Sequence, residues 1–319
     1  MRNKSPVSGA HSAMSALRRY SLAAGFGLFS LATCSPFAAL AQQAQNAQKV
    51  IVQAPGDGFP APGQLGMQTP NSPIAEEIQF LHNDILMPII TIISLFVLAL
   101  LVYVVLRFNE KTNPTPSRTT HHALLEVAWT IIPVMILVVI AIPSFRLLTH
   151  QLVIPQPDVT IKVTGNQWYW SYAYPKDQGG GFGFDSFLKP EDQIDPSKGD
   201  IWLLSVDNEA VVPVGKNVLI QMTASDVIHS FTVPAFGVRI DAVPGRLNTA
   251  WFRAEREGVY YGQCSKICGK DHAFMPIAVR VVSEQAYALW LAQAQKKFAQ
   301  VPNSMPAPGQ VAEALQSGN

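Results

Sequence analysis

Two long uncharged runs in the first half of the chain contrast with short alternating runs in the second half. Residues 85–106 and 127–145 contain no charged side chain. At 1.5 Å per residue, the first run gives about 33 Å of helix, which is enough to cross the hydrocarbon core of a bilayer. We therefore predict a transmembrane hairpin over residues 81–149, with helices at about 85–107 and 124–146. A helical hairpin buried in a soluble protein is the alternative, and uncharged runs of this length disfavour it.

The charges between the two runs indicate the orientation of the hairpin. Arg107, Lys111 and Arg118 lie in the connecting loop, against Glu110 alone. Basic loops of membrane proteins stay in the cytoplasm. We therefore expect a multi-pass protein of a bacterial inner membrane, with the domain after the second helix in the periplasm.

The first 41 residues have the features of a signal peptide, which agrees with this orientation. Arg18 and Arg19 precede a moderately apolar stretch, and Ala39-Leu40-Ala41 matches a cleavage site. An amphipathic tail of the mature protein is the alternative. Residues 42–80, which are polar and rich in Pro, Gly and Gln, are expected to form a flexible periplasmic leader.

From about residue 150 the pattern changes to short alternating runs separated by turn-forming residues. The runs lie at 159–163, 168–174, 201–206, 217–223, 230–233, 249–253, 258–263 and 277–282. Strands at this spacing predict a β-sandwich or barrel over residues 150–283. Residues 177–199, rich in Gly and Asp, are expected to form an excursion loop without a strand. Within residues 284–319 we predict a short helix at 285–299 and then a mobile tail.

Composition supports a membrane protein with a separate globular part and excludes several other classes. Hydrophobic residues make up 48% of the chain and charged residues only 14%, whereas soluble proteins average about 25% charged residues. The formal net charge of +1 gives no electrostatic basis for binding nucleic acid. Three cysteines cannot build a disulfide-rich scaffold. Cys34 lies in the expected signal peptide, so the mature chain would keep two.

Side chains that bind soft metal ions gather in one short segment. Cys264, Cys268, His272 and Met275 follow one another closely, and His229 lies upstream beside an expected strand. Thiolate, thioether and imidazole ligands together select copper over magnesium or calcium. Structural zinc sites do not recruit Met, and a mononuclear blue-copper site needs a single Cys. Two thiolates in one loop can bridge two copper ions, each capped by one His. A zinc site and a disulfide between the two cysteines remain as alternatives.

Five motifs occur in a fixed order along the chain. They are LEVAWTIIP (125–133), GNQWYWSY (165–172), SDVIHSFTVPAFGVRIDAVPGRLN (225–248), YYGQC (260–264) and HAFMPI (272–277). In this order they resemble the motifs of cytochrome c oxidase subunit II, and the resemblance extends over about residues 76–291. It implies a two-helix transmembrane hairpin followed by an all-β, cupredoxin-like Greek-key barrel that holds a binuclear copper centre, CuA.

The resemblance also implies the copper ligands, residue by residue. Cys264 and Cys268 would bridge the two coppers through their thiolates. One copper would be completed by His229 and Met275, and the other by His272 and the backbone carbonyl of Lys266. The implied function is an electron-transfer subunit of a proton-translocating respiratory oxidase. It would accept electrons from cytochrome c and pass them to the haem-containing catalytic subunit I, which reduces O₂ to water. The complex would also contain subunit III and would lie in the lipid bilayer.

Four further residues receive roles through the same resemblance. Trp168 matches the residue where electrons arrive from cytochrome c, although packing on a strand is its structural alternative. Asp207 and Asp226 match an acidic patch that steers a basic cytochrome. Glu126 matches the carboxylate that takes up protons at the so-called K pathway. A carboxylate at the start of a helix is also favoured by the helix dipole, which is the alternative for Glu126.

Lys266 is the position at which this sequence departs most clearly from the family. The family has Glu there, and its carboxylate helps to hold a Mg²⁺ or Mn²⁺ ion at the interface with the catalytic subunit. An ammonium group cannot ligate Mg²⁺, which needs oxygen ligands, so an interfacial Mg²⁺ is doubtful in this chain. Two other functions remain as alternatives. A copper-free quinol-oxidase-type structural subunit is disfavoured by the retained cysteines, and a soluble nitrous-oxide-reductase-type domain by the two apolar runs.

Overall fold

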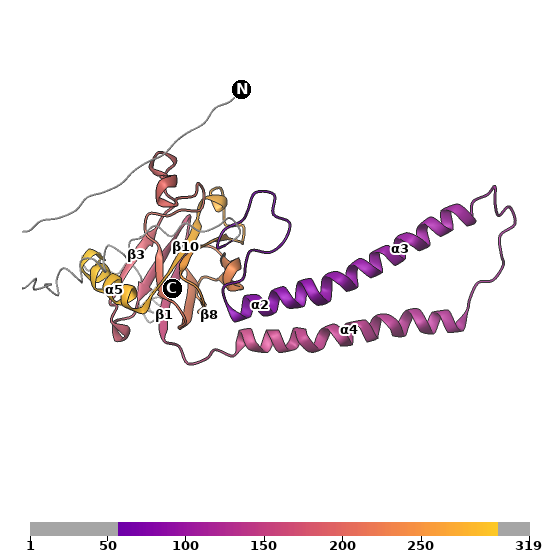
Figure 1. Ribbon diagram of the computed structural model, residues 1–319, viewed down its shortest axis with the longest axis horizontal. Coiled ribbons are helices and arrows are strands. Elements are labelled where there is room, and N and C mark those ends of the chain that lie inside the picture. The colour runs from indigo at the N-terminus through magenta and orange to yellow at the C-terminus, as the bar shows by residue number, and fades with distance from the viewer. Residues whose placement is uncertain (1–56, 299–319) are drawn as a thin grey trace, which may run out of the picture. The chain divides into compact units, whose positions relative to one another are not determined.

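The computed structural model describes residues 57–298, and the predictions for the signal peptide (1–41), for residues 42–56 and for the tail after 298 lie outside this range. Within it, two helical segments are long and apolar enough to cross a membrane (Figure 1). The first combines α2 (Pro73–Phe80), the π-helical turn η1 (Leu81–Leu86) and α3 (Met87–Arg107), and the second is α4 (Ala123–Leu152). Their most apolar windows have mean hydropathies of 3.1 and 2.5, and none of these windows is buried. The predicted pair of apolar helices is confirmed.

The first helix begins at Pro73, well before the expected residue 85. The Ser72 side chain accepts a hydrogen bond from the Ala75 amide at 3.0 Å, and Pro73 follows in the first helical position. This is a favourable helix start, because the cap satisfies a free amide and proline lacks one. Asn71 and Ser72 are buried, and the Ser72 hydroxyl donates to the Phe236 carbonyl at 2.7 Å. The last part of the expected flexible leader is therefore ordered and packed against the β domain.

Ten strands in the described part of the chain form two five-stranded sheets (Figure 1). The first sheet has the order β3-β2-β1-β5-β8 and the second β4-β10-β9-β6-β7. The strands of the first sheet are β1 (Val159–Asn166), β2 (Tyr169–Tyr174), β3 (Phe182–Ser186), β5 (Asn217–Ala224) and β8 (Asn248–Arg253). Those of the second are β4 (Ala210–Pro213), β6 (His229–Val233), β7 (Val238–Ala242), β9 (Gly258–Cys264) and β10 (Pro276–Val282). Strand β1 is parallel to β5 and β10 is parallel to β4, and the other pairs are antiparallel.

The hydrophobic core of this domain follows the alternation of the strands. In β5, every second residue from Val218 to Ala224 is buried, as expected for a sheet with one face on a core. The C-terminal helix α5 (Glu284–Phe298) packs Trp290 against Tyr174 and Phe182, with ring centroids 5.1 and 5.9 Å apart. The predicted all-β domain with a short C-terminal helix is confirmed. Short 3₁₀ helices connect the elements: η2 (Lys176–Gln178), η3 (Glu191–Gln193), η4 (Pro196–Lys198), η5 (Pro234–Phe236) and η6 (His272–Phe274).

Two local predictions were wrong. Residues 201–206 form a turn instead of a strand, because Leu203 has φ +68° and the Ile201 carbonyl accepts from the Leu204 and Ser205 amides. Conversely, β3 lies inside the segment expected to be a loop. Its residues alternate between buried and half-buried, so Phe182 and Phe184 reach the core although glycines surround them.

Candidate metal centre

The two cysteines of the described chain lie side by side at one end of the β domain. Cys264 is the last residue of β9 and Cys268 follows in the next loop. Both are buried and free, and their Sγ atoms are 3.9 Å apart. This distance excludes a disulfide, which requires about 2.05 Å. The loop therefore presents two thiol sulfurs to the same small volume.

The other four predicted ligands surround these sulfurs. The His229 Nδ1 atom, from the first residue of β6, is 4.0 Å from Cys264 Sγ. His272 Nδ1 and Met275 Sδ are 3.5 and 3.6 Å from Cys268 Sγ. The carbonyl oxygen of Lys266 is 3.3 Å from Cys264 Sγ. The fold thus brings together all six groups that sequence reasoning selected, from two strands and one loop.

The centre is sealed from solvent except near His272. His229, Met275 and both cysteines are buried, whereas His272 is half-buried. The Trp170 ring lies against His229, with centroids 6.0 Å apart, and its indole N–H donates to the Met275 carbonyl at 3.2 Å. These contacts fix two ligands from behind and exclude water.

Asp226 holds the buried histidine in place. Its Oδ1 atom is 2.8 Å from His229 Nε2, which leaves Nδ1 directed at Cys264. Burial lowers the pKa of His229, but the neighbouring Cys264 and Asp226 outweigh it and raise that pKa. A carboxylate behind a ligating imidazole fixes the orientation of the ring and increases its basicity.

The two thiols differ in acidity. Burial opposes ionisation of Cys264, but hydrogen bonds with His229, His272 and the backbone together outweigh it and lower the pKa of Cys264. Burial, followed by the charge on Cys264, raises the pKa of Cys268. Cys264 is therefore the more acidic of the two thiols, and Cys268 holds its proton more strongly. A metal that binds both sulfurs must displace that proton.

The donor set fits copper. Two thiols, two imidazoles and a thioether are soft or intermediate ligands, and this combination favours copper over hard cations. The described residues that can group as a metal site are His229, Cys264 and Cys268, whose ligand atoms lie within 4.8 Å of one another. Met275 adds a sulfur that structural zinc sites do not use.

Trp168 lies at the turn of the β1–β2 hairpin. Asn166 pairs with Tyr169, so Gln167 and Trp168 form the two-residue turn. The indole N–H of Trp168 donates to the Cys268 carbonyl at 3.3 Å, and the Gln167 side-chain amide donates to the same oxygen at 2.8 Å. The half-buried ring thereby connects the protein surface to the backbone of a metal-site cysteine.

The two predicted docking acids differ in their surroundings. Asp226 is engaged at the metal centre, since its carboxylate also accepts from the Gln167 and Val227 amides at 2.7 and 2.6 Å. Asp207 is exposed, and its Oδ1 accepts from the Phe187 and Asn208 amides, both at 2.8 Å. Of these two acids, Asp207 alone presents a carboxylate that is free of the metal centre.

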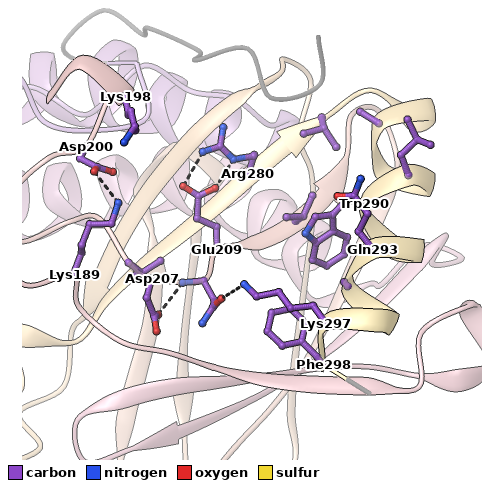
Figure 2. Close-up of a pocket in the computed structure, with 17 residues that line it drawn as sticks. Lys189, Lys198, Asp200, Asp207, Glu209, Arg280, Trp290, Gln293, Lys297 and Phe298 are labelled. Atoms are coloured by element: carbon purple, nitrogen blue, oxygen red, sulfur yellow. Dashed lines mark hydrogen bonds and ion pairs between the residues drawn. The ribbon is translucent and has the colours of Figure 1, made fainter. Parts of the chain in front are cut away.

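Asp207 also borders a cleft of about 710 Å³ beneath α5 (Figure 2). The charged groups that line it are largely paired with one another. Arg280 makes two hydrogen bonds to Glu209, Lys189 lies 2.7 Å from Asp200, and Lys297 donates to Asn208. Of these contacts, the hydrogen bond from Lys297 to Asn208 is the one that joins α5 to the sheet side of the cleft.

Glu126 lies near the start of α4, away from the metal centre. Its Oε1 atom accepts from the His122 amide at 3.0 Å, while the His122 ring accepts from the Leu125 amide at 3.3 Å. This reciprocal arrangement satisfies the free amides of the helix start. The geometry favours the helix-cap interpretation of Glu126.

Sequence reasoning missed three residues near Trp168. Gln167 binds the Cys268 carbonyl, and Gly269, with φ +131°, leaves room for the indole. The Lys270 ammonium lies 5.5 Å from the centroid of the Trp168 ring. Gly269 and Lys270 directly follow Cys268 in the sequence, which could have marked them as neighbours of the metal centre. Their contact with Trp168 arises from tertiary structure and has no signal in the sequence.

Comparisons with known proteins agree with this architecture. The family described as "Cytochrome C oxidase subunit II, periplasmic domain" matches residues 159–282, and its "transmembrane domain" matches residues 60–147. Cytochrome c oxidase subunit 2 of Cereibacter sphaeroides is 47% identical over 283 residues, which cover 85% of this chain and 91% of that protein. Probable cytochrome c oxidase subunit 2 of Rickettsia bellii is 49% identical over 245 residues, covering 77% and 89%. The crystal structure of the periplasmic domain of subunit II of cytochrome oxidase of Bradyrhizobium japonicum is 56% identical, covers 46% of this chain and 99% of that one, and has a TM-score of 0.42.

Proposed function

This chain belongs to the cytochrome c oxidase subunit II family, and from that premise we propose that it holds a binuclear copper centre between its two buried cysteines. The protein is the electron-transfer subunit of a haem-copper oxidase in a membrane. The observation that carries the proposal is the convergence of donors from β6, β9 and the following loop on two sulfurs 3.9 Å apart. Cys264 and Cys268 would bridge the metals, with His229 and Met275 on one and His272 and the Lys266 carbonyl on the other.

The protein holds these ligands in fixed positions and keeps water away from them. When bound, the copper pair supplies a redox centre that accepts and releases one electron. Asp226 orients the His229 ring, and the Trp170 indole fixes the backbone of Met275. Rigid ligands and excluded water keep the reorganisation of the site small when its charge changes.

Copper stoichiometry tests this ligand set. The full chain, purified in detergent and loaded with copper, should bind two copper ions and give the EPR spectrum of a mixed-valence pair. Cys268→Ser should reduce the stoichiometry to one copper, because a single Cys with His and Met favours a mononuclear site. Lys266→Ala is the matched control in the same loop. It keeps the backbone carbonyl, so both coppers should remain. A Cys268→Ser variant that still binds two coppers with the wild-type spectrum would contradict the bridging role.

We further propose that electrons reach the copper centre through Trp168. The supporting observation is its hydrogen bond to the Cys268 carbonyl, which joins a half-buried surface ring to a bridging cysteine. In the oxidase complex, Trp168→Ala should slow reduction by cytochrome c by roughly 100-fold, the scale of a misplaced reacting group, without changing the copper spectrum. Trp202→Ala is the control, since Trp202 is an exposed tryptophan outside this contact. Equal rates in the two variants would show that Trp168 only packs.

The remaining assignments concern the partners and the membrane. We propose that the β domain lies in the periplasm, which the basic loop with Arg107, Lys111 and Arg118 supports. There it would meet cytochrome c, with Asp207 as the available docking carboxylate, while subunits I and III and lipid surround the helices. Protease added to intact spheroplasts should cleave the β domain and leave the connecting loop uncut.

The chemistry of Lys266 argues against a strong interfacial Mg²⁺ site. Its side chain is exposed and makes no ion pair among residues 57–298. An ammonium group has no lone pair for a hard cation, and it would repel one. We propose that Mg²⁺ is lost or weakly held at this position, whereas the copper centre, which uses only the backbone carbonyl, is kept.

A further inference from the structure

The end of strand β1 lies directly against the ring of His229. A Cβ atom on Gly165 would lie 2.9 Å from His229 Cδ2 and 3.0 Å from its Cγ, which is too close for any side chain at this position. Gly165 does not have a positive φ, so its missing side chain serves this contact and not a turn of the backbone. A glycine inside a strand often marks such a close approach. The imidazole of His229 therefore occupies space that Gly165 leaves open.

The connection from β5 to β6 passes from the first sheet to the second and carries Asp226. The carboxylate of Asp226 holds the imidazole of His229. The connection is attached to the end of β1 through Ser225. The Ser225 amide donates to the Gly165 carbonyl at 3.1 Å, and its hydroxyl donates to Asn166 Oδ1 at 2.6 Å. Because Asp226 directly follows Ser225, a displacement of Ser225 is passed on to the carboxylate that orients the ring.

Asn166 is itself fixed by polar partners on the neighbouring strands. Its Nδ2 atom donates to Ser171 Oγ at 2.9 Å and to the Thr164 carbonyl at 3.2 Å. The Ser171 hydroxyl in turn donates to Asp185 Oδ1 at 2.6 Å. Asn166 and Ser171 are both buried. Every link donates in the same direction, from Ser225 toward the Asp185 carboxylate, and hydrogen bonds aligned in this way strengthen one another. The chain thereby keeps the amide oxygen of Asn166 directed at Ser225.

We propose that Gly165 and Asn166 are positioning residues for the copper ligand His229. Gly165 provides the space that the ring occupies, and Asn166 holds the connection that carries Asp226. Neither side chain belongs to the ligand set, so both act on the metal only through His229. The inference rests on the proposed copper centre. Groups that hold a metal ligand from behind typically change metal affinity by about 10- to 100-fold when they are replaced.

The first test compares Gly165→Ala with Gly183→Ala in the full chain, purified in detergent. Gly183 lies on β3 of the same sheet and, like Gly165, has no positive φ. A Cβ atom on Gly183 would lie 3.1 Å from the Tyr172 carbonyl oxygen, so both variants add one methyl group to a tight contact. Only the methyl group on Gly165 meets a copper ligand. The two variants therefore separate a displaced His229 from tight packing in general.

Three measurements are made on each variant: copper affinity by competition with a chelator, the EPR spectrum of the loaded protein, and denaturant unfolding of the copper-free protein. Gly165→Ala should weaken copper binding by roughly tenfold and change the copper hyperfine splitting. Gly183→Ala should keep the wild-type affinity and spectrum. The unfolding curves measure the cost of packing in both variants independently of the metal.

A second set of variants tests the hydrogen bond between Ser225 and Asn166. Asn166→Ala and Ser225→Ala should both weaken copper binding, and the double variant should be no weaker than Asn166→Ala, because both act through the same bond. Ser225→Thr keeps the hydroxyl and should retain the wild-type affinity and spectrum. Tyr174→Phe is the control, since it removes a buried hydrogen bond to the Val211 carbonyl at the other end of β2. It should lower stability without changing copper affinity.

Two outcomes would overturn the inference while the wild-type chain binds two coppers. One is wild-type copper affinity and EPR spectrum in both Gly165→Ala and Asn166→Ala, which would leave the copper centre in place and remove the positioning role. The other is an equal loss of affinity in Gly165→Ala and Gly183→Ala, which would show a general effect of packing. If the wild-type chain itself does not bind two coppers, the proposed centre and this inference fail together.

Discussion

Replacing Gly269 with alanine would test whether packing against the copper loop positions Trp168. Gly269 has φ +131°, a conformation that side chains rarely adopt. A Cβ atom there would lie 2.7 Å from Trp168 Cζ2 and 3.1 Å from Gln167 Nε2. Both neighbours donate to the Cys268 carbonyl, so the added methyl group must displace the groups that connect the ring to the cysteine.

The magnitude follows from two contributions. The strained backbone costs about 1–3 kcal/mol, and overpacking against the indole costs a further ~1–3 kcal/mol. Gly245 is the matched control, because it has φ +72° and a methyl group added there would meet nothing within 4 Å. Gly245→Ala should therefore lose only about 1–2 kcal/mol through backbone strain. The stability difference between the two variants therefore contains the contact with Trp168 together with the additional backbone strain at φ +131°, and the reduction rate separates the two.

The assay combines denaturant unfolding with stopped-flow reduction of the copper centre by cytochrome c, expressed per bound copper. Gly245→Ala should keep the wild-type reduction rate. Gly269→Ala should slow it by roughly tenfold or more, because small displacements of a positioned group have large kinetic effects. If Gly269→Ala loses the expected stability but is reduced at the rate of Gly245→Ala, the indole contact does not control electron transfer, and the reasoning is refuted.

Three further predictions concern Lys266, Glu126 and Asp207. In cells grown with manganese, the wild-type oxidase should show little EPR signal from an interfacial Mn²⁺ ion. Lys266→Glu should raise this Mn²⁺ signal without changing the copper spectrum. A stoichiometric Mn²⁺ signal in the wild type would show that other ligands are sufficient to hold the ion. Glu126→Gln keeps an oxygen acceptor for the His122 amide, so α4 should remain capped. Oxidase turnover should nevertheless fall, because the amide cannot take up a proton. Wild-type turnover would show that Glu126 acts only as a helix cap. Asp207→Asn preserves the acceptor for the Phe187 and Asn208 amides and should lower the association rate of a basic cytochrome by a few-fold at low salt. That effect should shrink toward about 0.15 M salt, where the Debye length is about 8 Å, and a salt-independent effect would argue against docking.

The sequence predicts the helices and most strands of this protein because their patterns are local. Uncharged runs identify α3 and α4, and alternation identifies β5 and β9 within one or two residues. The pattern misidentifies residues 201–206, whose apolar side chains lie in a turn. It also misses β3, because the glycines around Phe182 mask a strand that is stabilised by its neighbour β2. Apolar content alone does not distinguish a turn from a strand.

The metal site was more predictable than its surroundings. The ligand types and their spacing near Cys264 point to copper, and the fold places them around two sulfurs. The Trp168 contact with Cys268 joins residues a hundred positions apart, and the Asp226 carboxylate accepts a hydrogen bond from Gln167 in the β1–β2 turn. Such relations arise only when the two sheets meet, so no local pattern encodes them.

The burial of the copper ligands has a consequence for how the protein matures. His229 lies on β6, while Cys268 and Met275 belong to the loop between β9 and β10, and all three are buried in the closed fold. A metal bound there acts as a cross-link between chain segments and stabilises the native state over the unfolded one. Exchange then requires the loop to open, so chelators should strip the native protein slowly. Copper must therefore enter while the loop is open, so the opening of this loop sets the rate at which the folded protein takes up its metal.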